Sequence, residues 1–366
     1  MQGTIRRPQG EQMKKGMIVA AALTLILGAA VAWMGAPAGL AQGTSRTVDA
    51  RDIPVPAAAS QALRDSIAAM PMMPIADSAP STAAEWEEFV QQRDGAADGT
   101  LQPLAAAFGV EVDRFEVEGV SIYRVQPANV DPRHEEHRFL YVHGGAYVLG
   151  GGEAGVMEAV LIASRANIQV IAIDYRMPPA HPFPAAVDDA VAVYRHVLGN
   201  RPASSIALGG TSAGGGLTLA TVRQLIELGV DVPGAIYLGT PWADLTDASD
   251  TIHTNEAIDR VLLTYAGWLS AAARLYAGDH ELTHRLISPV YGDFDGFPPT
   301  YLISGTRDML LSDTVRVHRK LREAGVAADL NVYEGMSHAG YMIVADSPES
   351  QQVYSELGDF LVEHLD

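Results

Sequence analysis

The sequence predicts an α/β fold in which a mostly parallel central sheet is flanked by helices and carries a helical cap. From residue 138 onward, short apolar runs alternate with stretches of helical spacing, as in a parallel sheet that helices cover on both faces. Hydrophobic residues make up 48% of the 366 residues and charged residues 19%, so the chain can bury a large core. This length suits one large α/β domain with a cap.

Residues 110–366 are expected to form the α/β domain. Alternation of apolar and polar residues at 115–125 predicts an antiparallel hairpin. Strands are expected after it at residues 138–142, 169–173, 205–208, 235–238, 300–303 and 329–333. Helices are expected at residues 155–165, 185–198, 214–228, 314–324 and 347–364. Residues 247–285 contain two helical pieces and no strand, so we interpret them as an insertion that belongs to the cap.

Residues 42–109 are interpreted as an N-terminal arm followed by cap helices. Thr, Asp, Pro and Ala are frequent at 42–60, which predicts an extended arm. Helical spacing and the breakers around it predict short helices at 57–70, 85–92 and 100–108. No motif that carries chemistry occurs before residue 110.

Residues 1–41 have the layout of a secretory signal peptide. Basic residues precede an apolar run at 17–34, and small residues at 39–41 offer a cleavage site. An uncleaved membrane anchor is the alternative, because the run has about 18 residues and a span needs roughly 17–25. We therefore predict an exported protein, periplasmic or extracellular, which is membrane-anchored if this segment is retained.

Charge and cysteine content narrow the classes of function. The net charge of −19 repels polyanions, so we expect no nucleic-acid partner and a neutral or cationic small-molecule substrate. The chain has no cysteine, which excludes disulfides, a cysteine nucleophile and thiolate metal sites. The sequence leaves the oligomeric state open, a homodimer included.

Ser212, in the segment Gly-Thr-Ser-Ala-Gly at 210–214, is the candidate nucleophile. It follows an apolar strand and precedes a helix, and the small residues around it let the chain turn sharply. Its hydroxyl would then project from the C-terminal edge of the sheet. The helix behind it would direct its amides and positive dipole end at a developing oxyanion. The five residues alone are a weak signal, and the strand–turn–helix context strengthens it.

A serine nucleophile needs a base that an acid holds in place, and two strand ends downstream supply them in the required order. Asp308 ends one strand, and His338 lies in the loop after the next. We expect His338 to take the proton from Ser212 and Asp308 to fix the tautomer of that histidine. The alternatives are a helix cap for Asp308 and a surface-loop histidine for His338. Asp313 is the second candidate for the acid, although it suits the cap of the following helix better.

A glycine-rich segment, His-Gly-Gly-Ala-Tyr at 143–147, follows the strand expected at 138–142. Glycines let backbone amides approach a substrate closely. We expect the amides of Gly144, Gly145 and Ala213 to form an oxyanion hole. His143 is interpreted as a scaffold of this loop rather than as a second base.

Two other motifs are interpreted as structural. Residues 150–155 match a Gly-x-Gly-x-x-Gly fingerprint followed by Asp174, but a dinucleotide site should begin directly at the strand end. His-Glu-Leu-Thr-His at 280–284 matches a zinc motif but has no third-ligand extension, so we expect a solvated loop or short turn. We therefore predict no cofactor and no metal. Two more histidines are expected to be exposed in a charged loop, His134 and His137.

From about residue 47 to its end, the chain resembles the hormone-sensitive-lipase-like (bacterial family IV) esterases of the α/β-hydrolase superfamily. The resemblance implies an α/β-hydrolase fold and places the nucleophile, base and acid of the family on Ser212, His338 and Asp308, and its oxyanion glycines on Gly144 and Gly145. Many members have Asp where Thr211 stands, and this chain is similar to the branch with Thr. The motifs that carry the resemblance are residues 143–147, 174–176, 181–189, 210–215, 241–245 and 335–338.

The resemblance implies a serine carboxylesterase that acts on short-to-medium acyl esters through an acyl-enzyme. Lactone hydrolysis and amidase or transacylase activity are alternatives with the same triad, because other nucleophiles can intercept an acyl-enzyme. Some relatives are inactive receptors that lack the catalytic histidine, whereas His338 is present here. Aromatic and aliphatic residues of the cap are expected either to line the acyl pocket or to form plain cap core: Trp86, Phe89, Leu262, Tyr265 and Trp268.

Overall fold

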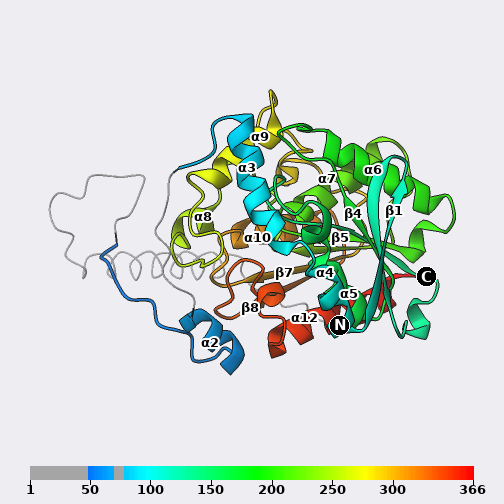
Figure 1. Ribbon diagram of the computed structural model, residues 1–366, viewed down its shortest axis with the longest axis horizontal. Coiled ribbons are helices and arrows are strands. Elements are labelled where there is room, and N and C mark those ends of the chain that lie inside the picture. Colours follow the sequence, from blue (N-terminus) through cyan, green and yellow to red (C-terminus); the bar gives the residue numbers. More distant parts are fainter. Residues whose placement is uncertain (1–47, 70–77) are drawn as a thin grey trace, which may run out of the picture. The chain divides into compact units, whose positions relative to one another are not determined.

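The computed structural model describes residues 48–69 and 78–366 (Figure 1). The chain separates into two units, residues 1–52 and 53–366, and the elements below belong to the second. The segment predicted as an export signal lies outside the described residues. Among the helices that are described, none is long and apolar enough to cross a membrane.

The described part of the chain contains an eight-stranded sheet with the order β1-β2-β4-β3-β5-β6-β7-β8. The first two strands form the predicted antiparallel hairpin, and β2 also pairs antiparallel with β4. All pairs from β4 to β8 along this order are parallel, which confirms the predicted fold class. The strands are β1 Val110–Val117, β2 Val120–Pro127, β3 Arg138–Val142, β4 Val170–Asp174, β5 Ile206–Thr211, β6 Ala235–Gly239, β7 Thr300–Gly305 and β8 Ala328–Tyr333.

Side chains alternate along the central strands between two hydrophobic cores, one on each face of the sheet. In β3, Leu140 and Val142 belong to one core, whereas Phe139 and Tyr141 belong to the other. Both faces are therefore buried, which explains why the central strands read as continuous apolar runs. The helices that follow these strands are α5 Met157–Ala166, α6 Ala185–Leu198, α7 Ala213–Glu227, α10 Leu311–Glu323, α11 Gly340–Ile343 and α12 Pro348–His364.

Within the described residues, the remaining α-helices come from the N-terminal part and from the segment between β6 and β7. They are α2 Gln61–Ala69, α3 Ala83–Asp94, α4 Leu101–Phe108, α8 Asp250–Thr254 and α9 Trp268–Ala277. A capping box between Thr82 and Glu85 begins α3. Helix α3 lies beside α9 (Figure 1), where the rings of Phe89 and Trp268 are 5.6 Å apart. The N-terminal helices and the later segment therefore meet.

Candidate active site

Ser212 occupies the sharp turn between β5 and α7. Its backbone has φ 62° and ψ −123°, a region that residues other than glycine rarely adopt. Two backbone hydrogen bonds hold it there. The Ser212 amide donates to the Gly239 carbonyl at 2.8 Å, and the Trp242 amide donates to the Ser212 carbonyl at 2.8 Å. The strained turn is therefore bonded to the last residue of β6 and to the chain just after it.

Glycines on both sides of Ser212 allow the turn to lie against the end of β3. A Cβ atom at Gly210 or at Gly214 would lie 2.1 Å from the carbonyl oxygen of Val142. One at Gly144 would lie 2.7 Å from the carbonyl oxygen of Thr211. Side chains at these positions would push the nucleophile turn and the glycine-rich loop apart, so the small residues seen in the sequence are a steric requirement.

The expected oxyanion residues lie on two elements that meet at Ser212. Gly144 and Gly145 line the same cavity as Ser212, and Gly145 has φ 105°. Ala213 is buried and is the first residue of α7. The amides of the first turn of α7 have no partners within the helix, so they and the helix dipole favour negative charge beside Ser212.

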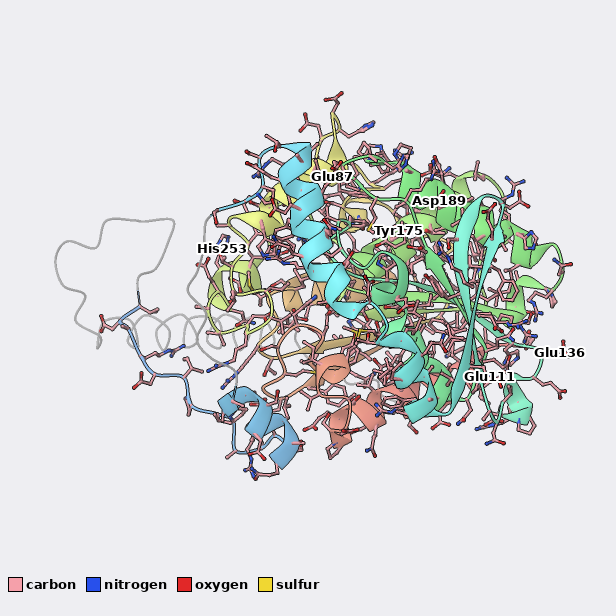
Figure 2. The ribbon with its side chains drawn as sticks, in the orientation of Figure 1. Glu87, Glu111, Glu136, Tyr175, Asp189 and His253 are labelled. Carbon is pink, nitrogen blue, oxygen red and sulfur yellow. The ribbon has the colours of Figure 1, made fainter. Side chains whose placement is uncertain are left out.

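His143 supports the glycine-rich loop from behind. Its ring stacks on Tyr175 with centroids 4.1 Å apart, and its Nδ1 lies 2.7 Å from the Gly144 carbonyl oxygen. Tyr175, which is buried just after β4 (Figure 2), donates its hydroxyl to the His143 carbonyl at 2.8 Å. These contacts fit the predicted scaffold role.

His338 and Asp308 form a buried pair at the end of the sheet. The His338 Nδ1 lies 3.1 Å from Asp308 Oδ1, and the two side chains are 4% and 0% exposed. The other oxygen of Asp308 accepts from the Ser304 hydroxyl at 2.9 Å, and Oδ1 also accepts from the Leu310 amide at 2.8 Å. The carboxylate is therefore fixed on both oxygens.

The charge environment favours the protonated imidazole of His338. Burial by itself would lower the pKa of His338. The negative charge and hydrogen bond of Asp308 outweigh it, together with the charges of Asp259 and Glu158, so the pKa is raised above the ordinary 6.5. An imidazole with this environment can accept a proton and hold it while a neighbouring negative charge develops.

Ser212 and His338 open onto one cavity of about 570 Å³. Its wall is mostly apolar and includes Leu262 and Trp268, two of the five residues that the sequence suggested for a pocket. The other three are not among the lining residues, and one of them, Trp86, is buried in a core. No sequence motif points to several further lining residues, which come from distant segments: Met157, Val261, Leu269, Met342 and Ile343.

A buried carboxylate that the sequence did not single out lies under the nucleophile turn. Glu158 accepts hydrogen bonds from the hydroxyls of Thr211 at 2.8 Å, Tyr141 at 2.8 Å, Tyr237 at 2.9 Å and Tyr354 at 3.3 Å. Burial raises the pKa of Glu158, and these four hydroxyls oppose that shift. Thr211, the residue before the nucleophile, is therefore part of a polar network around one carboxylate.

Carboxylates of the chain itself occupy the amides of the Gly-x-Gly-x-x-Gly segment. Asp94 accepts from the amides of Gly150 at 3.0 Å and Gly151 at 3.1 Å, and Asp174 accepts from the amide of Gly152 at 3.0 Å. The amides that would bind a pyrophosphate in a dinucleotide site are therefore already paired. Asp94, at the end of α3, also lines the cavity.

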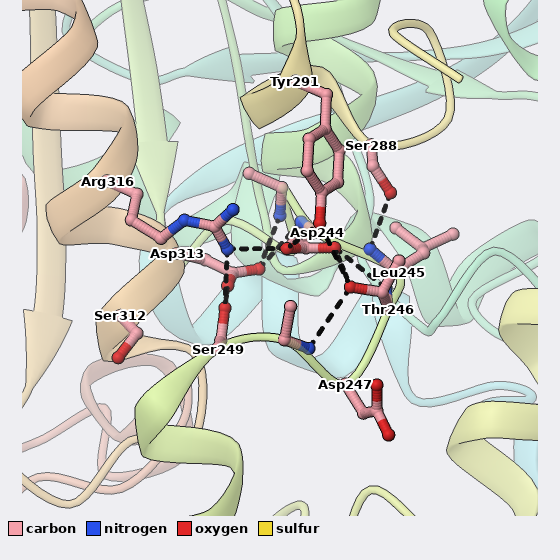
Figure 3. A network of polar contacts seen from close by, with 12 residues as sticks. Asp244, Leu245, Thr246, Asp247, Ser249, Ser288, Tyr291, Ser312, Asp313 and Arg316 are labelled. Carbon is pink, nitrogen blue, oxygen red and sulfur yellow. Dashed lines mark hydrogen bonds and ion pairs between the residues drawn. The ribbon is translucent and has the colours of Figure 1, made fainter. Parts of the chain in front are cut away.

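Asp313, the second candidate for the acid, lies in a different network (Figure 3). It accepts from the amides of Ala243 at 3.0 Å and Asp244 at 2.9 Å and from the hydroxyl of Ser249. Arg316 pairs with Asp244 in the same network. The prediction that Asp313 caps α10 was wrong: no side chain caps this helix, and the Asp313 carboxylate accepts instead from residues 243, 244 and 249.

The remaining histidines form no metal site among the residues that the structure describes. His280 and His284 lie in the irregular segment after α9 rather than on a helix, as expected. The expected exposure of His134 and His137 was wrong. They are only 1% and 6% exposed, and their Nδ1 atoms lie 2.9 Å apart, so one ring donates a hydrogen bond to the other and both can be buried.

Residues 139–342 match the profile of a family described as having the α/β hydrolase fold. An acetyl-hydrolase of Streptomyces hygroscopicus is 34% identical over 238 residues, which are 65% of this chain and 78% of that protein. An esterase of Acinetobacter venetianus is 33% identical over 60% of this chain and 73% of its own length.

Solved structures of esterases have the same fold. The structure of esterase E25 superposes with a TM-score of 0.87 and 47% identity, and the match covers 88% of this chain and all of that one. An esterase from the bacterial hormone-sensitive lipase family has a TM-score of 0.67 and 29% identity over 78% of this chain and all of its own.

Proposed function

Because this chain is a serine esterase that belongs to the α/β-hydrolase family, of the hormone-sensitive-lipase type, we propose that it hydrolyses short-to-medium acyl esters through Ser212, His338 and Asp308. One observation carries the proposal. Ser212 and His338 line a single cavity, and Nδ1 of that histidine is bonded to the buried Asp308. Nucleophile and base thus line one cavity, and the acid is bonded to the base, which supports the roles that acyl transfer needs.

In the first half of the reaction, the Ser212 oxygen bonds to the ester carbonyl carbon while His338 Nε2 takes the serine proton. The carbonyl oxygen becomes an oxyanion, which the amides of Gly144, Gly145 and Ala213 would stabilise; one such donor contributes about 3 kcal/mol to lowering a barrier. The bond to the alcohol oxygen then breaks. The alcohol leaves with the proton from His338, and an acyl-serine remains.

In the second half, His338 takes a proton from water as its oxygen attacks the acyl carbon. Collapse of the second oxyanion releases the carboxylic acid and returns the proton to Ser212. Asp308 stays ionised throughout, keeps the proton of the neutral imidazole on Nδ1 and stabilises the imidazolium.

The cavity supports an apolar acyl group of limited size. Its volume of about 570 Å³ lies in the range of small-molecule pockets, and most of its lining is aliphatic or aromatic. Asp94 is a polar exception at the glycine-rich loop, where its oxygens are held by amides. An uncharged ester with a short or medium chain fits such a wall better than a charged substrate.

We also propose export, from the charge and hydropathy pattern of residues 1–41 alone. Mass spectrometry of protein from the culture or the periplasm tests it. A mature N-terminus at Gln42 is expected, and an intact N-terminus in the membrane fraction would favour the anchor.

The test of the activity is a panel of p-nitrophenyl esters of rising chain length with the wild type and Ser212→Ala. We expect turnover of short-to-medium esters, covalent labelling of Ser212 by a fluorophosphonate, and neither in the variant. The melting temperature should hardly change, because Ala removes one half-exposed hydroxyl. Retained turnover in Ser212→Ala would overturn the assignment.

A further inference from the structure

A second buried carboxylate lies beside the His338–Asp308 pair and has no part in the proposed triad. Asp259, between α8 and α9, is 0% exposed. Its Oδ2 accepts from the amide of Met309 at 2.9 Å and from the amide of His338 at 3.3 Å. One oxygen therefore bridges the loop that carries the acid and the loop that carries the base.

The other oxygen of Asp259 holds the wall of the cavity. Its Oδ1 accepts from the amides of Val261 at 2.9 Å and Leu262 at 3.2 Å. Both of these residues line the cavity with Ser212. The single carboxylate thus connects the substrate-binding wall to the two loops behind it.

Neighbours of Asp259 fasten the same segment, residues 251–262, to the same loops. The Asn255 side-chain amide donates to the Asp308 carbonyl at 2.8 Å, and the Thr251 hydroxyl donates to the Met309 carbonyl at 2.8 Å. The Arg260 amide donates to the Ser337 hydroxyl at 3.2 Å. Asp259 differs from these neighbours because its one carboxylate bonds to the acid loop, the base loop and the cavity wall.

We propose that Asp259 is a positioning residue of the esterase: its carboxylate fixes Asp308 and His338 relative to each other and to the cavity wall at 261–262. The inference rests on the proposed function, since it assigns a role within that triad. Asp259 acts through the backbone of its neighbours, which distinguishes it from a residue that touches the substrate.

Besides its hydrogen bonds, the negative charge of Asp259 acts on His338. The groups whose charges act on His338 are the carboxylates of Asp308, Asp259 and Glu158. Those acting on Asp259 are Asp308 and His338: burial and the Asp308 charge raise the pKa of Asp259 to about 6, and His338 opposes them. Two cations are neighbours in the chain: Arg260 directly follows Asp259, and Arg307 directly precedes Asp308. An ionised Asp259 therefore helps to stabilise the imidazolium of His338.

The variant Asp259→Asn separates these effects from simple loss of fold. An asparagine has one acceptor oxygen, and its NH₂ group would face a pair of backbone N–H groups, so one of the two bridges is lost. Misplacement of the triad by about 1 Å can slow an enzyme by roughly 100-fold. We expect kcat to fall by up to that factor and the acid-side pKa of kcat/KM to move down, because a negative charge near His338 is removed.

Asp313→Asn is the matched control. Asp313 is also fully buried and also accepts two backbone amides, but it lies outside the cavity and the triad. Its variant should keep the wild-type pH profile of kcat/KM. A purely structural role for Asp259 would lower the melting temperature and leave the acid-side pKa in place, which would overturn the inference.

Wild type and Ser212→Ala are measured in the same series, so that a failure of the proposed function can be told from a failure of the positioning role of Asp259. Equal turnover in both would refute the proposed function itself. An inactive Ser212→Ala with wild-type kcat and pH profile in Asp259→Asn would refute only the positioning role. If Asp259→Asn does not fold, Asp259→Glu serves instead, because it keeps the charge but displaces the carboxylate. We then expect kcat to fall while the acid-side pKa of kcat/KM is retained. A wild-type kcat in Asp259→Glu would overturn the proposal.

Discussion

Thr211 Oγ1 donates a hydrogen bond to Glu158 Oε1 at 2.8 Å, one residue before the nucleophile. The same hydroxyl lies 2.7 Å from the hydroxyl of Tyr341, so Thr211 joins a tyrosine to the buried carboxylate. Here the acidic group under the turn comes from α5, and threonine fits because a hydroxyl can donate to it.

Replacing Thr211 with Val should destabilise the fold without abolishing the turn. The change keeps the shape but removes a donor from the buried Glu158 and a partner from Tyr341, at a cost of about 1–3 kcal/mol. Urea denaturation measures it. The exposed Thr254→Val is the control and should stay within about 0.5 kcal/mol of wild type. An unchanged free energy of unfolding in Thr211→Val would show that the other donors satisfy Glu158 fully.

The pH profile of kcat/KM should have an acid limb centred above 6.5. Because His338 must be neutral to accept the serine proton, and its pKa is raised in the folded protein, activity is lost as pH falls through that raised value. Asp308→Asn should lower kcat by about 10⁴-fold, since the imidazole tautomer is no longer fixed, and move the acid limb downward. A flat profile between pH 5 and 8 would contradict the role of His338 as base.

The residues of the site that follow directly after strands could be predicted from the sequence. Ser212, Gly144 and the glycines around them sit at strand–turn–helix junctions, where the required backbone geometry restricts the residue types within a few positions. Asp308 and His338 were found because each follows a strand that the apolar pattern reveals. The parallel sheet then brings the ends of these strands to one edge.

Asp259 and Glu158 could not be predicted, because their partners are distant in the chain. Asp259 bonds to His338 across 79 residues, and Glu158 bonds to Thr211 across 53. Neither stands in a motif, and a lone acidic residue in a sequence is far more often a solvated one. The burial of His134 was missed for a different reason: its partner His137 is only three residues away, but histidines between charged residues are more often exposed.

Asp313 should make stability depend on pH between about 4 and 7. Burial and, less strongly, the charge of Asp244 raise the pKa of Asp313 from 3.8 to about 7. The folded state therefore binds more protons than the unfolded state in this window, so the free energy of unfolding falls as pH rises through it. Chemical denaturation at several pH values should show a shallower fall for Asp313→Asn. An identical slope would mean that the donors around this carboxylate keep it ionised.

Gly214→Ala should abolish activity by displacing the nucleophile turn from β3. A Cβ atom there would lie 2.1 Å from the Val142 carbonyl oxygen and 2.7 Å from that of His143, and both are backbone atoms that cannot rotate away. We expect a loss of about 1–3 kcal/mol or more in the free energy of unfolding, and a larger relative loss of turnover because the oxyanion loop moves with His143. Gly95→Ala is the control, since its nearest neighbouring atom would be 3.9 Å away and its φ is −61°. Wild-type turnover in Gly214→Ala would show that the close approach of β3 and the turn is not needed to place Ser212.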